Sequence, residues 1–198
     1  MCKSMFRFIC VFIPVVLIFC PNLAADNVTI QAKWSYANLD NPEGVFKNPK
    51  GFSVGIGSRL YKSNGVILWF EYHSTESPST YSSAVLDLKL YSAFAEFKAQ
   101  VPVPRGQALI PYFMGGLGLT RFSLSELENS AKYSETNLFF RFGAGLDIVL
   151  SERFSISSGV DYSIMTGELS YHSIAYLGAL KFSRVNIGFI YHLTKKRK

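Results

Sequence analysis

Hydrophobic and polar residues alternate along most of the chain after residue 25. The segment from 138 to 150 is the clearest, with Leu138, Phe140 and Phe142 on one side and Arg141 and Asp147 on the other. A period of two places successive side chains on opposite faces of a β-strand. Eight such segments can be distinguished, near residues 28–36, 52–61, 66–73, 84–101, 109–122, 138–150, 154–165 and 182–193.

The length and number of these segments predict strands that cross a membrane. Ten residues in a strand tilted by about 40° cover roughly 25 Å, which is the height of the apolar band on membrane barrels. No window after residue 25 contains 18 consecutive apolar residues, so the sequence predicts no membrane-spanning helix. We therefore predict an all-β fold, an eight-stranded antiparallel up-and-down transmembrane β-barrel.

The connections between the segments alternate between short and long. Short links follow the second, fourth and sixth segments, whereas the long links cover about 37–51, 74–83, 123–136 and 166–181. Outer-membrane barrels combine short periplasmic turns with longer extracellular loops. An even number of strands returns the chain to the side where it started, so both termini of the barrel are predicted to be periplasmic.

The first 25 residues have the features of a secretory signal peptide. Lys3 and Arg7 come before an uncharged apolar run over 8–20, and Ala24-Ala25 supplies small residues for cleavage. We predict a signal peptide over 1–25 and an outer-membrane β-barrel domain over 26–198 with a short basic C-terminal tail. All three cysteines precede residue 26, so the mature chain is expected to contain no disulfide.

Charge and composition argue against several classes of function. Without Lys3 and Arg7, the 20 basic residues fall to 18 against 14 acidic ones. This small excess, interrupted by acids, does not resemble a nucleic-acid-binding surface. Three widely separated histidines and no mature cysteine give no zinc-like cluster. No cofactor is predicted.

Three segments carry a resemblance to a known family. They are Pro-Tyr-Phe-Met-Gly-Gly-Leu-Gly-Leu at 111–119, Phe-Gly-Ala-Gly-Leu-Asp at 142–147, and Ser-Glu-Arg-Phe-Ser-Ile at 151–156. The chain resembles the outer-membrane β-barrel domain family of small porin-like proteins, and is similar in pattern to OmpX and the OmpA transmembrane domain. The resemblance implies an eight-stranded barrel in the cell outer membrane, with no defined activity.

The same resemblance implies partners. These are outer-membrane lipids and lipopolysaccharide, together with the barrel-assembly machinery during biogenesis. Members of the family usually end on an aromatic residue that this machinery reads. Here the candidate signal at 187–191 is followed by His192, Leu193, Thr194 and a basic tail at 195–198. The chain therefore departs from the family pattern at its end.

The polar face of the predicted strands carries charges of both signs. Eight strands enclose a space that side chains just fill, so we expect paired interior charges rather than an open aqueous pore. The predicted interior ion network, which is structural, consists of Lys33, Arg59, Glu71, Asp87, Lys89, Arg141, Asp147, Asp161 and Arg184.

Three alternatives to a non-catalytic membrane barrel stay open: a narrow small-solute channel, a lipid A-modifying enzyme and a soluble lipocalin-like binding barrel. Against an enzyme, the adjacent pairs His73-Ser74 and His172-Ser173 would place histidine and serine on opposite faces if they lie in strands. Against a lipocalin, the second face is mainly apolar and no Gly-x-Trp start surrounds Trp34.

We therefore predict a structural or surface-interaction role, without catalysis, exerted through the extracellular loops. Recognition residues accumulate on loops that a rigid scaffold holds in place. The candidate contact residues lie in the third long link and are Glu126, Glu128, Lys132 and Tyr133.

Overall fold

The computed structural model describes residues 28–40, 48–61, 64–76, 86–104, 106–126, 132–171 and 175–193. The predicted signal peptide and the basic tail lie outside the described residues. The strands are β1 (Val28–Asp40), β2 (Lys50–Tyr61), β3 (Asn64–Glu76), β4 (Leu86–Gln100), β5 (Leu109–Glu126), β6 (Lys132–Val149), β7 (Phe154–Tyr171) and β8 (Ala175–His192).

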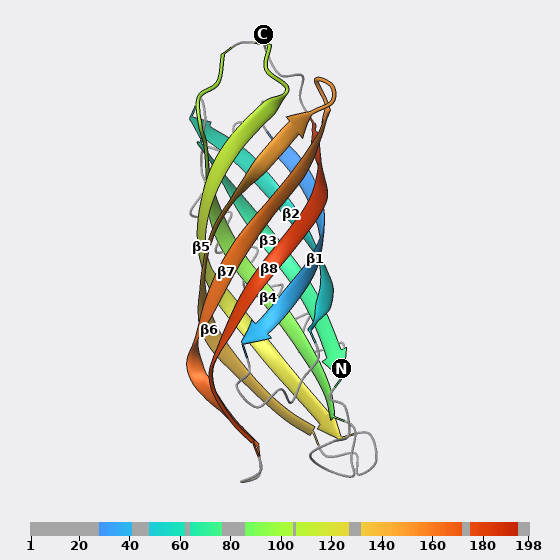
Figure 1. The fold of residues 1–198 in the computed structure, drawn as a ribbon, viewed down its shortest axis with the longest axis vertical. Helices are drawn as coiled ribbons and strands as arrows, with labels where there is room; N and C mark the ends of the chain where they lie inside the picture. The colour runs from blue at the N-terminus through green and yellow to red at the C-terminus, as the bar shows by residue number, and fades with distance from the viewer. Residues whose placement is uncertain are drawn as a thin grey trace.

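Each strand pairs antiparallel with the next one in the sequence, and β8 pairs with β1 to close the barrel (Figure 1). The predicted fold, an eight-stranded antiparallel up-and-down barrel, is thereby confirmed. The links between β2 and β3, β4 and β5, and β6 and β7 lie at one end, which we call the turn end. The other four links lie at the opposite end, which we call the loop end. No helix in the described ranges is long and apolar enough to span a membrane.

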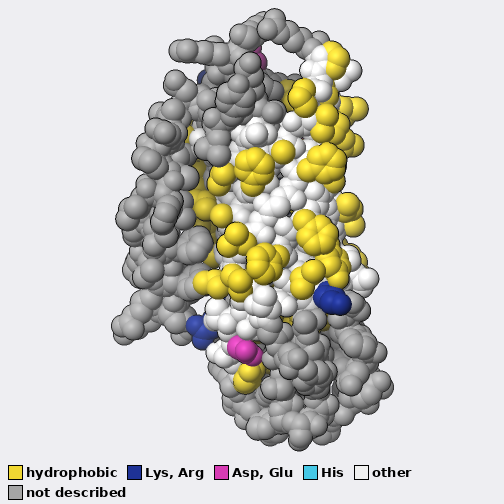
Figure 2. All heavy atoms as spheres, turned by 90° about the vertical axis from the view of Figure 1, so that its left-hand side faces the viewer, with side chains coloured by type: hydrophobic (Ala, Val, Ile, Leu, Met, Phe, Trp, Pro, Cys, Tyr) yellow, Lys and Arg dark blue, Asp and Glu magenta, His cyan; other side chains and the backbone are white. Residues whose placement is uncertain are grey.

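The alternation of residue types decides which side chains face outward. In β6, Phe140 and Phe142 are exposed on the outer wall, whereas Arg141 and Asp147 are buried inside. Large apolar side chains cover the outer wall in Figure 2. A surface this apolar does not occur on a monomer in water, so the wall is suited to contact with lipid. The largest outward side chains include Trp34, Phe52, Ile56, Phe113, Leu117, Phe140, Phe142, Val160, Val185, Ile187 and Phe189.

The interior has two zones along its length. Charged and polar side chains occupy the part nearer the turn end and the middle. Toward the loop end, most inward positions carry apolar side chains. These belong to one buried cluster that also includes Ile67 and Trp69, which lie nearer the turn end than Glu71 in β3. Its members are Ala37, Leu39, Ile67, Trp69, Leu88, Leu90, Phe94, Phe122, Leu124, Phe139, Met165, Leu180 and Phe182.

Small residues make room for the large inward side chains of neighbouring strands. Gly118 in β5 is opposite Phe94 in β4, and a Cβ added at Gly118 would lie 2.3 Å from the Cβ of Phe94. Real Cβ atoms do not approach one another so closely. A glycine is therefore needed at this position if Phe94 is to point into the barrel.

The predicted third and fourth long links are wrong in extent. β5 continues to Glu126 and β6 begins at Lys132, while β7 continues to Tyr171 and β8 begins at Ala175. The serines of 123–126 suggested a loop. In β5, however, Phe122 and Leu124 point inward and are buried, and Ser123 and Ser125 occupy the outward positions. Beyond the lipid, an outward face contacts water and is polar.

The β5–β6 and β7–β8 hairpins separate at the loop end, as Figure 1 shows. The pairing of β6 with β7 ends at Leu138 and Thr166. The register of β7 against β8 shifts between Ile164 and Glu168, and a bulge of this kind bends and twists a strand. From this point to the loop end, the edge of β6 that faces away from β5 is not paired with any described strand.

The hydroxyl group of Thr166 shows which residues of β6 present this edge. It donates a hydrogen bond of 3.1 Å to the backbone carbonyl of Leu138, so this carbonyl points toward β7. Backbone groups alternate in direction along a strand. The N–H and C=O groups of Ser134 and Thr136 therefore also point toward the β7 side of β6. Both residues lie closer to the loop end than the last pair with β7.

Replacing Phe142 with arginine should destabilise the barrel strongly, because it places a charge on the outer wall within the apolar band. We expect Phe142→Arg to lower the free energy of unfolding by about 2–4 kcal/mol, measured by urea unfolding in lipid vesicles. The matched control is Thr136→Arg, an outward position in the same strand beyond the band, where we expect at most about 1 kcal/mol. Equal effects at both positions would show that the wall at Phe142 does not contact lipid.

Candidate functional site

A cluster of four charged side chains crosses the barrel interior. Glu71 in β3 accepts hydrogen bonds from Arg141 in β6, at 2.7 and 2.8 Å, and from Arg184 in β8, at 2.6 Å. Asp161 in β7 accepts 2.8 Å from Nε of Arg184 and 2.9 Å from the Asn186 amide. In the ring of eight strands β7 is opposite β3, and β6 and β8 flank β7, so these ion pairs span the lumen.

The cluster is buried and further held by neighbouring groups. Arg184 also donates to the Ser163 hydroxyl, and the Arg141 guanidinium lies 4.0 Å from the centre of the Phe94 ring. Buried ion pairs are tolerated only where such additional contacts satisfy the remaining donors and acceptors. The arrangement fixes strands from opposite walls relative to one another.

A second buried pair lies nearer the turn end. Lys98 contacts Asp147 at 2.7 Å, and the Gln100 amide donates to the same carboxylate at 2.8 Å. The Lys98 ammonium also lies 3.8 Å from the centre of the Tyr112 ring. Tyr112 in turn accepts a hydrogen bond of 3.2 Å from Ser157, so the second pair is joined to β7.

A third ion pair, between Lys33 and Glu96, is longer and has fewer hydrogen bonds. The Lys33 ammonium is 3.9 Å from the Glu96 carboxylate and 4.2 Å from the centre of the Trp69 ring. Neither carboxylate oxygen of the buried Glu96 has a hydrogen-bond donor among the described residues. With this pair, the described interior contains four cations, Lys33, Lys98, Arg141 and Arg184, and four carboxylates, Glu71, Glu96, Asp147 and Asp161.

Six residues of the predicted network lie inside the barrel and are buried. They are Lys33, Glu71, Arg141, Asp147, Asp161 and Arg184. The side chain of Arg59, near the end of β2, lies outside the described residues.

Asp87 and Lys89 were placed on the wrong face. They pair with each other at 2.5 Å on the outer wall of β4, while Leu88 and Leu90 are buried inside. The prediction took leucine as the mark of the lipid face, but this part of β4 lies at the loop end, where the inward face is apolar.

The sequence reading missed Glu96 and Lys98, the interior charges of β4. Outward Ala93, Ala95 and Phe97 alternate with the inward positions Glu96 and Lys98. Extending this alternation from Glu96 back toward Leu86 would have given the correct inward and outward positions for the whole strand.

A serine, a histidine and a carboxylate meet in line inside the barrel. The Ser35 hydroxyl in β1 is 2.7 Å from Nε2 of His73, and Nδ1 of His73 is 3.4 Å from Glu71. The histidine reaches across β2 because Gly51 lies between the two strands. A Cβ added at Gly51 would lie 2.3 Å from the His73 ring. No local signal in the sequence pointed to this group, because its members come from two strands that are not neighbours.

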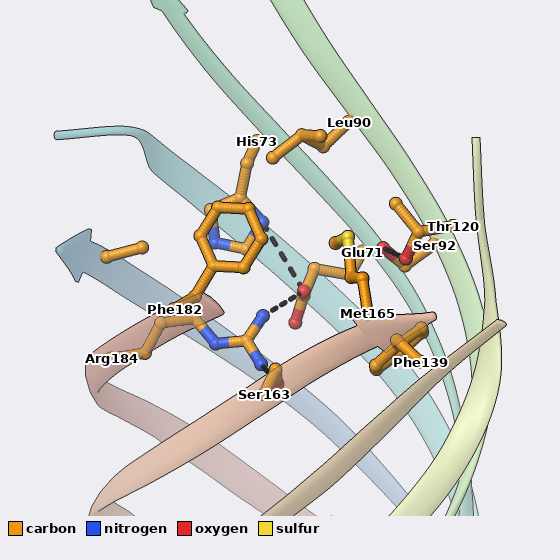
Figure 3. Close-up of a pocket in the computed structure, with 11 residues that line it drawn as sticks. Glu71, His73, Leu90, Ser92, Thr120, Phe139, Ser163, Met165, Phe182 and Arg184 are labelled. Atoms are coloured by element: carbon orange, nitrogen blue, oxygen red, sulfur yellow. Dashed lines mark hydrogen bonds and ion pairs between the residues drawn. The ribbon is translucent and has the colours of Figure 1, made fainter. Parts of the chain in front are cut away.

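This order of groups resembles the nucleophile, base and orienting carboxylate of a hydrolase. Its surroundings do not. Glu71 already binds two guanidinium groups, and Ser35, His73 and Glu71 are all buried. The adjoining cavity, drawn in Figure 3, is lined by polar side chains such as Glu71 and Arg184 together with apolar ones such as Phe139, and has room for about one water molecule. No substrate-sized space reaches Ser35 through it.

The predicted loop contacts fall at the β5–β6 connection. Glu126 ends β5 and Lys132 begins β6, but their side chains, and all of Glu128, lie outside the described residues. Tyr133 lies in β6 rather than in a loop. Its ring packs against the interior apolar cluster, and its hydroxyl donates to Glu135 at 2.8 Å. Among the described side chains, no three His, Cys, Asp or Glu residues are grouped to bind a metal ion.

Comparisons with known proteins give one family and several structures. A family model described as "Outer membrane protein beta-barrel domain" matches residues 10–192. No curated protein matches the chain. The chain is similar in fold to Neisserial surface protein A, with 16% identity over 83% of this chain and 96% of that one, at a TM-score of 0.59.

Two further structures are similar. Ail, the attachment invasion locus protein of Yersinia pestis, was solved in complex with the heparin analogue sucrose octasulfate. It shares 18% identity over 85% of this chain and 99% of its own, with a TM-score of 0.55. A major outer membrane protein from Thermus thermophilus shares 9% identity over 84% and 99%, also with a TM-score of 0.55. At these identities the likeness extends to the fold alone.

Removing Glu71 should be far more costly than removing an outward carboxylate. Glu71→Ala leaves two buried guanidinium groups without their shared partner, so we expect a loss of about 3–5 kcal/mol in the free energy of unfolding. Asp87→Ala, which removes an acid from the outer wall, should cost at most about 1 kcal/mol. Urea unfolding in lipid vesicles measures both, and a small loss for Glu71→Ala would contradict the cross-lumen role.

Proposed function

The chain belongs to the outer membrane protein beta-barrel domain family, and from this premise we propose that it is a non-catalytic outer-membrane barrel acting through its outward-facing end. In this proposal the loop end faces the exterior and the turn end faces the periplasm. The barrel provides a rigid support, and its role is structural or consists of contacts made at the cell surface.

The observation that carries this proposal is the ion cluster across the lumen. Glu71 joins β3 to Arg141 and Arg184 on the opposite wall, and most of the buried apolar cluster lies beyond them toward the loop end. A continuous water path would have to separate these ion pairs and expose their charges without partners, which is unfavourable. This argues against a small-solute channel.

The same packing argues against the lipid A-modifying alternative. Ser35 and His73 have a suitable mutual distance, but both are buried, and the space beside His73 holds no acyl chain. A lipid substrate would have to displace the interior apolar cluster. The outer wall carries no comparable group among the described residues.

The loop end offers a surface that could bind a partner. The backbone N–H and C=O groups of Ser134 and Thr136 lie on the β7 side of β6, where the pairing of β6 with β7 has ended. An exposed strand edge can pair with an extended segment of another protein. Among the similar structures, one is described as a surface protein and one as an attachment protein, which supports a surface role for a barrel of this fold.

The orientation can be tested by labelling single cysteines, since the chain has none after residue 25. A membrane-impermeant thiol reagent should label Ser134→Cys in intact cells, because Ser134 is exposed at the loop end. Arg153→Cys, exposed in the turn between β6 and β7, should react only after the outer membrane is permeabilised. The reverse pattern would overturn the proposed surface role.

The absence of transport and catalysis can be tested together. We expect the wild-type barrel to show no stable, ion-selective openings in planar bilayers, whereas Glu71→Ala should increase the leak by removing the shared partner of two arginines. Lipid A from cells that express the wild type should have the same acylation as lipid A from cells that do not. An altered profile that reverts with Ser35→Ala or His73→Ala, but not with Ser74→Ala, would identify an enzyme.

A further inference from the structure

Two rows of outward side chains lie next to each other on β2, β3, β4 and β5 near the loop end. The register places Phe52 beside Tyr72, Tyr72 beside Tyr91, and Tyr91 beside Arg121. The Phe52 and Tyr72 rings are 5.8 Å apart, and those of Tyr72 and Tyr91 are 5.2 Å apart. Aromatic side chains with a polar tip are typical of the edge of the lipid layer.

The next row toward the loop end is basic and hydroxylated. Lys50 pairs with Ser74, Ser74 with Lys89, and Lys89 with Ser123. Side chains directly opposite each other in an antiparallel pair have Cβ atoms about 5 Å apart. Lys50 and Lys89 lie in this row on either side of Ser74, and Arg121, which ends the aromatic row, is the diagonal neighbour of Lys89. We call these three cations the basic patch.

We propose that the basic patch binds the phosphate groups of lipopolysaccharide in the outer leaflet. This proposal rests on the orientation given above, which turns the loop end outward. The aromatic row would contact the upper part of the acyl chains. The ammonium and guanidinium groups, with the hydroxyls of Ser74 and Ser123, would donate hydrogen bonds to phosphate oxygens.

The position of the patch favours a lipid over an acidic polypeptide. Its cations project from the outer wall at the edge of the apolar band, where headgroups lie, rather than from the tips of the hairpins. Figure 2 shows one face of the barrel, on which the visible Lys and Arg side chains lie at the borders of the apolar region. In the described parts of the eight strands, the outward Lys and Arg side chains are all near the loop end, namely Lys50, Lys89, Arg121 and Lys181.

Two cations of the patch have partners within the chain. Lys89 is paired with Asp87 at 2.5 Å, and Arg121 donates to the Ser134 hydroxyl at 3.2 Å. The register partner of Asp87 is Glu76, so two carboxylates of the described strands lie in the row beyond the three cations. A phosphate can bind between the cations without displacing a buried group, because all these side chains lie on the outer wall.

Lys181 in β8 provides a matched control. It is exposed and also lies near the loop end, but its register partner in β1 is Asp40 and the next outward residue of its own strand is Ser183. If binding depended only on the total charge of the barrel, losing Lys181 would matter as much as losing one cation of the patch.

The test measures binding of purified lipopolysaccharide to the folded barrel in zwitterionic detergent. The triple variant Lys50→Gln/Lys89→Gln/Arg121→Gln should bind at least about tenfold more weakly than the wild type. Each of its single substitutions should weaken binding more than Lys181→Gln, which should stay within about twofold. Enzymatic removal of the lipid A phosphates should reduce wild-type affinity to that of the triple variant. Heat-modifiable migration in gels checks that every variant is folded.

Other outcomes would overturn the proposal. Equal affinity of the wild type and the triple variant would show that the patch does not bind the lipid. Competition by inorganic phosphate at millimolar concentration would indicate a site for the free anion, and stronger competition by poly-glutamate would indicate an acidic protein partner. The measurement in detergent does not depend on orientation in the cell. A failure of this binding test can therefore be distinguished from a reversed orientation, which the cysteine labelling would show.

Discussion

Glu71 binds guanidinium groups from the opposite wall of the barrel, and this contact reflects a constraint on the whole molecule. Closing eight strands leaves an interior that side chains fill, with little water to solvate a charge. Each inward cation therefore needs a carboxylate within reach from another strand. Arg141 and Arg184 meet this need through Glu71 and Asp161, and Lys98 meets it through Asp147. These partners lie far apart in the sequence, so the ion pairs form only when the strands are in their final register.

Along a strand, the types of residue at the outward and inward positions change, although the alternation itself continues. In β5, outward Leu117 contacts the lipid side, while farther along the strand the outward positions are Ser123 and Ser125. The inward positions change in the opposite sense, from Gly116 and Gly118 to Phe122 and Leu124. Where it crosses the membrane, the barrel is apolar outside and holds its buried charges inside, together with apolar side chains such as Trp69 and Met114. Beyond the membrane it has an apolar interior and a polar outer face, as in a water-soluble protein.

The zonation explains what the sequence could and could not predict. Within the membrane, alternation predicted the phase of β6 correctly, because Phe140 and Phe142 face lipid and Arg141 faces the lumen. At the loop end the same rule failed, and Leu88 and Leu90 were assigned to the lipid face although they are buried inside. The contacts among Ser35, His73 and Glu71 could not be predicted from local patterns. They require the pairing register of three strands and depend on Gly51 of the intervening strand. Local patterns identify the strands, whereas contacts across the lumen depend on how the cylinder closes.

Inward and outward cations differ in the partners available to them. Inside, the four buried cations face four buried carboxylates of the chain itself, so the interior of the described barrel is close to neutral. Outside, Lys50 and Lys89 flank Ser74, Arg121 is diagonal to Lys89, and Asp87 pairs with Lys89. These cations lie on the outer wall, so an anion can bind between them without displacing a buried partner. The interior charges thus stabilise the fold, and the outward charges are suited to a ligand at the edge of the membrane.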